Sequence, residues 1–192
     1  MFKHSILFLI SATAALAGPP LVCHRIDIGA AQSLPWRNVD GWDGIDPKYN
    51  LQNLASDTLR LLEAKTPLNV RMETLRRAAI YSARTEGLAE RVSGLLLDWA
   101  KAKDTESMAW FDAGYFAETV RQTSFIYRYD MLPPAERKAW VHRGDKLSTD
   151  GRPSIEMAIR LGGKGMEPVL AMTDEYRKAD LKFQSTKSAA LK

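Results

Sequence analysis

The sequence is poor in metal-binding and disulfide-forming residues. Its 192 residues include one cysteine and three histidines. An intramolecular disulfide needs two cysteines, and a structural zinc module takes four Cys or His ligands of which at least two are cysteines. The sequence therefore excludes both, and we expect neither a metal nor another cofactor.

No charge of one sign dominates the chain. Lys and Arg number 27 and Asp and Glu 23, for a net charge of +4. This excess is too small for a dedicated nucleic-acid binder, which concentrates its basic residues into one patch. The 45% hydrophobic and 26% charged residues are close to the globular average, which excludes disorder or a coiled-coil repeat as the overall character of the chain.

Long hydrophobic runs are also missing. The longest, from Ile6 through Ala17, is shorter than the roughly 20 residues that span a bilayer. It follows Lys3 and ends in Ala15-Leu16-Ala17, just before Gly18-Pro19-Pro20. A charged start followed by an apolar run and a small-x-small end is typical of a secretory signal peptide. We predict that residues 1–17 are cleaved after Ala17, and that the mature protein is soluble and secreted or periplasmic, with no transmembrane segment.

Cys23 is then a single cysteine in an oxidising compartment. It is a thiol sheltered by packing, an intermolecular disulfide that makes a homodimer, or a lipidation site. Val22 is a poor residue before a lipidated cysteine, so lipidation is the least favoured of the three.

The chain divides into an irregular part and a helical part. Residues 18–49 are punctuated by Pro and Gly and predict an irregular arm packed on the body, with a strand or extended piece at Val22–Ile28. Residues 50–184 predict a single all-α domain, and residues 185–192 a frayed basic tail. Later helices are expected at Pro134–Arg143, Pro153–Leu161 and Pro168–Phe183.

Evenly spaced capping residues indicate how the helices are connected. Thr66, Thr85 and Asp104 each precede an apolar stripe of helical period and follow one another at intervals of 19 residues. The connections are short, so neighbouring helices run antiparallel. We predict antiparallel helical hairpins that form a compact bundle or a short α-solenoid. The segment Ala109–Phe116 resembles the helix-turn core of a tetratricopeptide unit. The resemblance is one of architecture, tetratricopeptide- or HEAT-like, and implies a groove for a peptide or a partner helix.

Asp112 lies in the most apolar of the predicted helices, residues 105–128. Its neighbours one turn away, Met108 and Phe116, place it on the face toward the core. A buried carboxylate must be paired, hydrogen-bonded or protonated. We expect a structural ion pair with Arg71; the alternative is a poised catalytic acid.

Glu106 suggests a second catalytic hypothesis. The dipeptide Glu106-Ser107 resembles the catalytic pair of lytic transglycosylases and lysozyme-like enzymes, although the Gly-Leu-Met-Gln segment of these enzymes is absent. The resemblance implies a general acid on a glycosidic oxygen. The alternative is that Glu106 stabilises the start of a helix through the dipole.

Aromatic and basic side chains add further candidates. Trp36 and Trp42 lie in a loop rich in aspartate, where they form a sugar-stacking platform or a loose calcium loop, or else anchor the loop on the helices while Asp46 caps a helix near Pro47. We favour the anchors. Trp110 joins them as a possible binding surface.

A basic cluster is expected to be a solvated helix face rather than an anion site; its members are Arg76, Arg77 and Arg84.

Two functions follow, of which the first is favoured. The chain is a protein- or peptide-interaction module and not an enzyme, or it is a small cell-envelope glycan hydrolase or lyase with Glu106 or Asp112 as general acid. The module predicts an exposed apolar patch, with Trp42 or Trp110 in it. The enzyme predicts a cleft with a carboxylate of raised pKa at its base. An exposed Glu106 together with an ion-paired Asp112 would argue against the enzyme.

Overall fold

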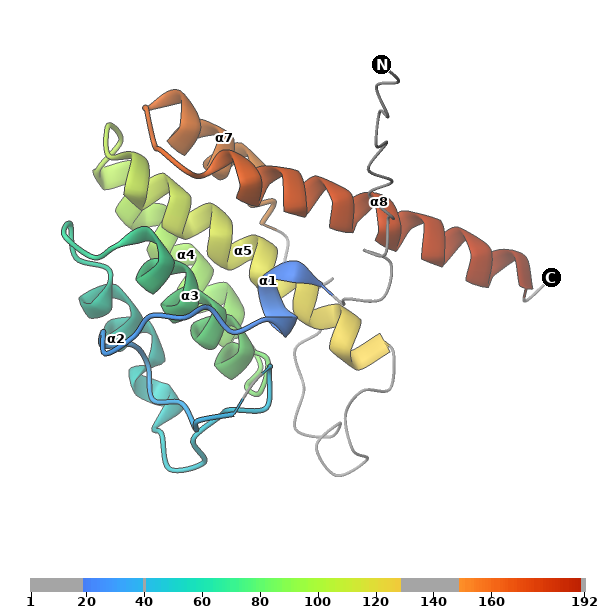
Figure 1. The fold of residues 1–192 in the computed structure, drawn as a ribbon, viewed down its shortest axis with the longest axis horizontal. Coiled ribbons are helices and arrows are strands. Elements are labelled where there is room, and N and C mark those ends of the chain that lie inside the picture. Colours follow the sequence, from blue (N-terminus) through green and yellow to red (C-terminus); the bar gives the residue numbers. More distant parts are fainter. Residues whose placement is uncertain (1–18, 40, 129–148, 191–192) are drawn as a thin grey trace, which may run out of the picture.

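The computed structural model describes residues 19–39, 41–128 and 149–190, and within them all regular secondary structure is helical (Figure 1). The α-helices are α1 (Pro20–Cys23), α2 (Leu54–Leu61), α3 (Leu68–Ser82), α4 (Leu88–Ala102), α5 (Ser107–Arg128), α7 (Arg152–Arg160) and α8 (Glu167–Ala190). A 3-10 turn, Leu51–Asn53, leads into α2. Within these ranges there is no strand, only an isolated β-bridge between Trp36 and Ile45. The all-α prediction is confirmed. Of the two alternatives for Val22–Ile28, the strand is wrong: Val22 and Cys23 belong to α1, and His24 after them is extended. The predicted leader and the predicted helix Pro134–Arg143 lie outside the described residues.

The helix starts follow the predicted spacing, but the N-cap positions of α3 and α4 are Pro67 and Gly87, and neither supplies a side-chain cap. Helices α3, α4 and α5 begin at Leu68, Leu88 and Ser107, two or three residues after the predicted caps. The Thr66 hydroxyl donates to the Leu61 carbonyl instead of capping α3, and Gly87 precedes α4 in the left-handed region at φ 71°. Nor does Asp46 cap a helix: it accepts from the Lys48 N–H in a turn. Asn50 caps the 3-10 turn that leads into α2: its side chain accepts from the Gln52 N–H at 3.0 Å.

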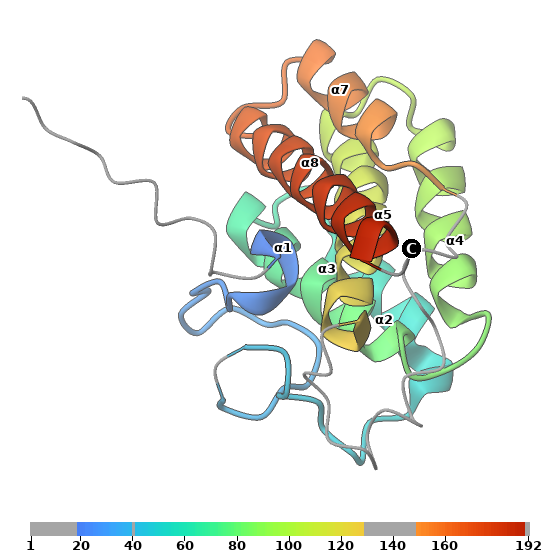
Figure 2. The same ribbon diagram turned by 90° about the vertical axis from the view of Figure 1, so that its right-hand side faces the viewer.

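Helix α5 is the centre of the molecule. It packs against α1, α3, α4 and α7, which surround it in both views (Figures 1 and 2). Its side chains are therefore buried around almost the whole circumference, as the sequence predicted. The fully buried ones include Phe111, Tyr115, Phe116, Val120 and Ile126. This packing is that of a compact bundle around a central helix, and the tetratricopeptide- or HEAT-like repeat stays a prediction.

Buried arginines of α3 hold the N-terminal arm on the bundle. Arg76 donates to the carbonyls of Val22 and Gly41 at 3.0 Å, and Arg77 donates to that of Leu34 at 2.7 Å. Both guanidiniums also pair with the buried Glu73. The predicted solvated face is therefore wrong for Arg76 and Arg77, which are 0% and 8% exposed. The reason is that an arm without regular structure leaves carbonyls unpaired, and buried carbonyls need donors.

The C-terminal helices complete the bundle. Helix α7 ends at Arg160, one residue before the predicted end at Leu161. Gly162 follows at φ 84°, and the Gly163 N–H donates back to the Ala158 carbonyl. Helix α8 continues to Ala190, where the sequence predicted an end at Phe183 and a frayed tail from residue 185. Within the described part of the chain, no helix combines the length and hydrophobicity that crossing a membrane requires.

Candidate functional site

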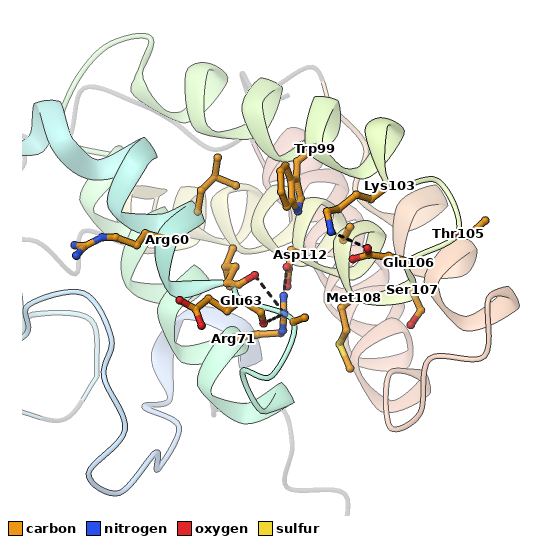
Figure 3. Close-up of a pocket in the computed structure, with 14 residues that line it drawn as sticks. Arg60, Glu63, Arg71, Trp99, Lys103, Thr105, Glu106, Ser107, Met108 and Asp112 are labelled. Atoms are coloured by element: carbon orange, nitrogen blue, oxygen red, sulfur yellow. Dashed lines mark hydrogen bonds and ion pairs between the residues drawn. The ribbon is translucent and has the colours of Figure 1, made fainter.

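A cleft of about 480 Å³ opens where α2, α4 and the start of α5 meet (Figure 3). Apolar side chains and charged groups alternate around it. The lining residues are Leu59, Arg60, Leu62, Glu63, Ala64, Arg71, Trp99, Lys103, Thr105, Glu106, Ser107, Met108, Ala109 and Asp112. The two acidic residues proposed from the sequence, Glu106 and Asp112, are thus brought to one cavity.

The floor of the cleft is an ion pair between Arg71 of α3 and Asp112 of α5. The two side chains are 2% and 1% exposed, and an Arg71 Nη1–H donates to Asp112 Oδ2. Arg71 also donates to three carbonyls of the loop that joins α2 to α3: those of Thr66 at 3.1 Å, of Leu62 at 3.3 Å, and of Glu63. One guanidinium therefore ties this loop, α3 and α5 together beneath the cleft.

In this pair only one of the two carboxylate oxygens of Asp112 accepts a hydrogen bond. Its other oxygen, Oδ1, is buried and has no hydrogen-bond partner among the described residues. Burial raises the pKa of the Asp112 carboxyl to about 7, against the lowering effect of the Arg71 charge. This carboxyl therefore holds a proton more readily than an exposed aspartic acid does.

The wall of the cleft carries an exposed tryptophan. Trp99 of α4 is 41% exposed, and Figure 3 shows its indole on the side of the cleft where Asp112 lies. The Lys103 ammonium lies 4.8 Å from the centre of the indole ring and 2.7 Å from Glu106 Oε1. The Glu106 side chain is 48% exposed and stands just before α5, where a carboxylate also favours the helix dipole.

The three tryptophans proposed from the sequence lie elsewhere. Trp36 packs edge-on against Tyr81 and under Arg76, so it anchors the arm. Gly44 makes room for this ring, since a Cβ there would lie 1.8 Å from Trp36 Nε1. Trp42 is half-buried against the core, and Trp110 donates from its indole to the Asp104 carbonyl at 2.9 Å.

Trp99 is not among the site residues predicted from the sequence, although its position carries a signal. It ends an apolar stripe of helical period on α4, and such a stripe predicts a buried side chain. That stripe contains both Leu95 and Leu96, which makes it wider than a single buried face. Leu96 is buried, whereas Leu95 and Trp99 are exposed one turn apart.

A second cavity, of about 540 Å³, adjoins the cleft at the end of α2. Arg60 and Glu63 line both cavities. Its other side consists of arm residues 32–35 together with Tyr49, Asp57 and Leu61. The two cavities therefore lie next to one another, with the side chains of Arg60 and Glu63 between them.

Cys23 is a half-buried free cysteine on α1. Burial raises the pKa of its thiol to about 11, partly offset by the charge of Arg76, so the thiol is protonated at neutral pH. A homodimer through Cys23 stays a prediction. Within the described ranges, no three His, Cys, Asp or Glu side chains are grouped so that they could hold a metal ion.

The fold and the site together define a small helical bundle with a cleft above a buried ion pair. No protein-family model, curated protein or solved structure matches the chain. Its function is therefore argued from the chemistry of the cleft.

Proposed function

We propose that this chain is an exported helical interaction module that binds a peptide segment of a partner protein in the cleft between α2, α4 and α5. The observation that carries the proposal is the exposed Trp99 beside the apolar side chains of Leu59, Leu62 and Met108. An indole that is left exposed next to other apolar groups gains free energy when a partner covers it. Tryptophan is also enriched among the residues that dominate binding energy at interfaces.

The adjoining cavity favours an extended ligand over a compact one. A peptide that covers Trp99 and crosses Arg60 and Glu63 reaches the second cavity without leaving the surface. An extended peptide buries its side chains in separate pockets along its length, which is how grooves of this kind obtain specificity.

Selection from a displayed random peptide library tests the proposal. We expect the protein to enrich peptides whose affinity falls at least about tenfold, or about 1.4 kcal/mol, on Trp99→Ala. Leu95→Ala is the matched control, because Leu95 is exposed one turn away on α4 but does not line the cleft. No enrichment, or enriched peptides that bind Trp99→Ala as tightly as the parent protein, would reject the proposal.

One observation favours a glycan-acting hydrolase or lyase as a second candidate. Asp112 lies at the floor of a cleft with a pKa raised to about 7, which suits a general acid. Its ion pair with Arg71 and the exposure of Glu106 are the two features that argue against it. Incubation with peptidoglycan, followed by mass spectrometry of the soluble fragments, separates the two. Release by the parent protein but not by Asp112→Asn would favour the enzyme.

A further inference from the structure

We infer that the peptide bound in the cleft places a basic side chain between the Trp99 indole and the carboxylates of Asp112 and Glu106. This inference rests on the proposed function, because it names the ligand chemistry of the same cleft. It commits to one occupant, a lysine or arginine side chain of a partner peptide, and three features of the site support it.

The first feature is the hydrogen-bonding pattern of the floor. Each of the three guanidinium nitrogens of Arg71 already donates to a protein oxygen. Asp112 Oδ1 is in contrast a buried acceptor without a partner among the described residues. An unsatisfied buried carboxylate oxygen is costly, so the ligand group that complements this floor is a hydrogen-bond donor.

The second feature is that the wall already holds an ammonium group. Lys103 places its Nζ over the Trp99 ring at 4.8 Å while it pairs with Glu106 at 2.7 Å. A cation is attracted to an indole face by the ring quadrupole, more strongly where water is excluded. A ligand ammonium or guanidinium finds the same two partners, and it competes with Lys103 for them.

The third feature is the balance of charge around the cleft. Arg71 and Asp112 compensate one another, as do Lys103 and Glu106, and Arg60 pairs with Asp57 at 2.9 Å. Glu63 lines both cavities, is exposed, and forms no ion pair in the part of the chain that the structure describes. Counted over both cavities, the lining residues therefore include four carboxyl side chains and three basic ones, and this balance favours a cationic ligand.

Met108 is an adaptable side chain in the lining of the cleft. It lines the cleft one helical turn before Asp112, on the same face of α5. Its unbranched side chain has three rotatable bonds and repacks at little cost. Because Oδ1 is buried, contact with the ligand group requires lining side chains to move, and Met108 is one that does so at little cost.

The test compares two small probes that differ in one charged group. Nα-acetyl-lysine methylamide and Nα-acetyl-norleucine methylamide are titrated into the ¹⁵N-labelled protein, and the Trp99 indole N–H resonance, assigned with Trp99→Phe, is followed by NMR. We expect saturable shifts with the lysine compound and at least about tenfold weaker binding of the norleucine compound. Lys103→Met, which removes the competing ammonium, is expected to tighten binding of the lysine compound about threefold.

The outcomes separate this inference from the proposed function. Equal binding of the two probes, or no shift of the Trp99 resonance with either probe, would overturn the inference that the ligand group is a basic side chain. The same inference is overturned if Lys103→Met binds the lysine compound no more tightly than the parent protein does. Selected peptides that tolerate replacement of every Lys and Arg by norleucine do the same while leaving the peptide module intact. A lysine-specific shift at Trp99, with no peptide enriched in the selection, instead keeps the inferred cation site and rejects the peptide module. Tighter binding of chitotriose than of the lysine compound overturns the inference in favour of a glycan.

Discussion

Asp112 and Arg71 stabilise the bundle only as a pair. Arg71→Met leaves a carboxylate that is 1% exposed without its counter-charge. We expect a loss of about 3–5 kcal/mol in the free energy of unfolding, measured by urea denaturation, because an uncompensated buried charge is costly. The double variant Arg71→Met with Asp112→Leu is expected to recover most of that loss, since it removes both charges. Equal destabilisation of the single and double variants would contradict this account.

The same carboxyl gives the stability a specific pH dependence. Its pKa is raised from 3.8 to about 7 in the folded protein, so between these values the folded state binds more protons than the unfolded state. The contribution of Asp112 to stability is therefore fully present below pH 4 and is lost as the pH rises through 7. Glu73 and Asp150, whose pKa values are lowered, act in the opposite sense and only as the pH falls below their ordinary values of 4.5 and 3.8.

Urea denaturation at a series of pH values tests this dependence. We expect the free energy of unfolding to fall between pH 5 and pH 8 in the parent protein and to change less over that range in Asp112→Asn. A parent protein that becomes more stable over this range would show that another group dominates the titration.

The pairing of Arg71 with Asp112 was within reach of the sequence, whereas the unmatched oxygen was not. Asp112 stands out because it interrupts an apolar helix, and Arg71 because it borders a neighbouring stripe. Which oxygen is left over depends on where the loop carbonyls of residues 62–66 lie, since these occupy the other donors of Arg71. Helical periodicity in the sequence does not predict where the carbonyl groups of such a loop lie.

At the scale of elements, two glycines set the distance between α5 and α7. A Cβ on Gly114 would lie 2.6 Å from the Gly151 carbonyl oxygen, and a Cβ on Gly151 would lie 2.3 Å from that of Gly114. Gly114→Ala is therefore expected to push α7 away and to destabilise the protein by about 1–3 kcal/mol. Gly94→Ala on α4 is the matched control: it meets nothing within 4 Å and is expected to stabilise the helix by up to about 1 kcal/mol. Thermal unfolding of both variants measures the difference, and a loss of stability shared by both would contradict the steric argument.

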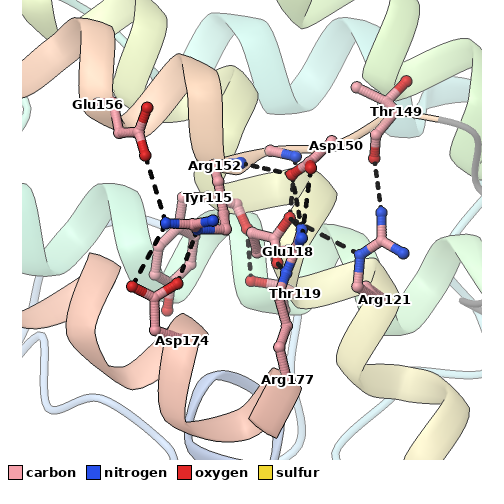
Figure 4. A network of polar contacts seen from close by, with 11 residues as sticks. Tyr115, Glu118, Thr119, Arg121, Thr149, Asp150, Arg152, Glu156, Asp174 and Arg177 are labelled. Carbon is pink, nitrogen blue, oxygen red and sulfur yellow. Dashed lines mark hydrogen bonds and ion pairs between the residues drawn. The ribbon is translucent and has the colours of Figure 1, made fainter. Parts of the chain in front are cut away.

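Arg177 fastens α8 to the bundle. It donates to the buried Glu118 of α5 at 2.6 Å and to Asp150, just before α7, at 2.6 Å, so one side chain joins three segments (Figure 4). We expect Arg177→Met to cost about 2 kcal/mol, the scale of hydrogen bonds to charged groups, and to speed amide exchange in α8 ahead of α3 and α5. Lys101→Met serves as control, because the 4.0 Å pair of Lys101 with Asp98 is exposed. Unchanged exchange in α8 would show that apolar packing alone holds the helix.

Helix positions were predicted more accurately than the irregular segments between them. Apolar stripes and short connections located α3, α4 and α5 to within a few residues, because periodicity directly reflects a buried face. The buried role of Arg76 and Arg77 was missed, because two neighbouring arginines on a helix resemble a solvated face until the carbonyls of the arm are in place.

At the scale of the whole molecule, the cleft depends on parts that are distant in the sequence. It combines the end of α2, the loop before α3, the last turn of α4 and the first turn of α5. The sequence identified Asp112 and Glu106 as candidate site residues, but only tertiary packing brings them to one cavity with Trp99. The arm likewise became part of the core because Leu21, Val22 and Leu34 are buried with the helices.

Because these arm residues are buried, the position of the predicted signal-peptide cleavage affects the stability of the fold as well as export. Pro19 accepts from the backbone N–H groups of Val22 and Cys23, and the Leu21 N–H donates to the Gln122 side chain of α5 at 2.9 Å. A chain that begins at Gly18 keeps all of these contacts, whereas one that begins at His24 removes two core side chains. We expect the exported protein to start at Gly18, as read by intact mass and N-terminal sequencing, and a version that starts at His24 to be destabilised by about 3 kcal/mol or more. A mature protein that retains Met1 would contradict the export prediction, and equal stability of the two truncated forms would contradict the structural role of α1.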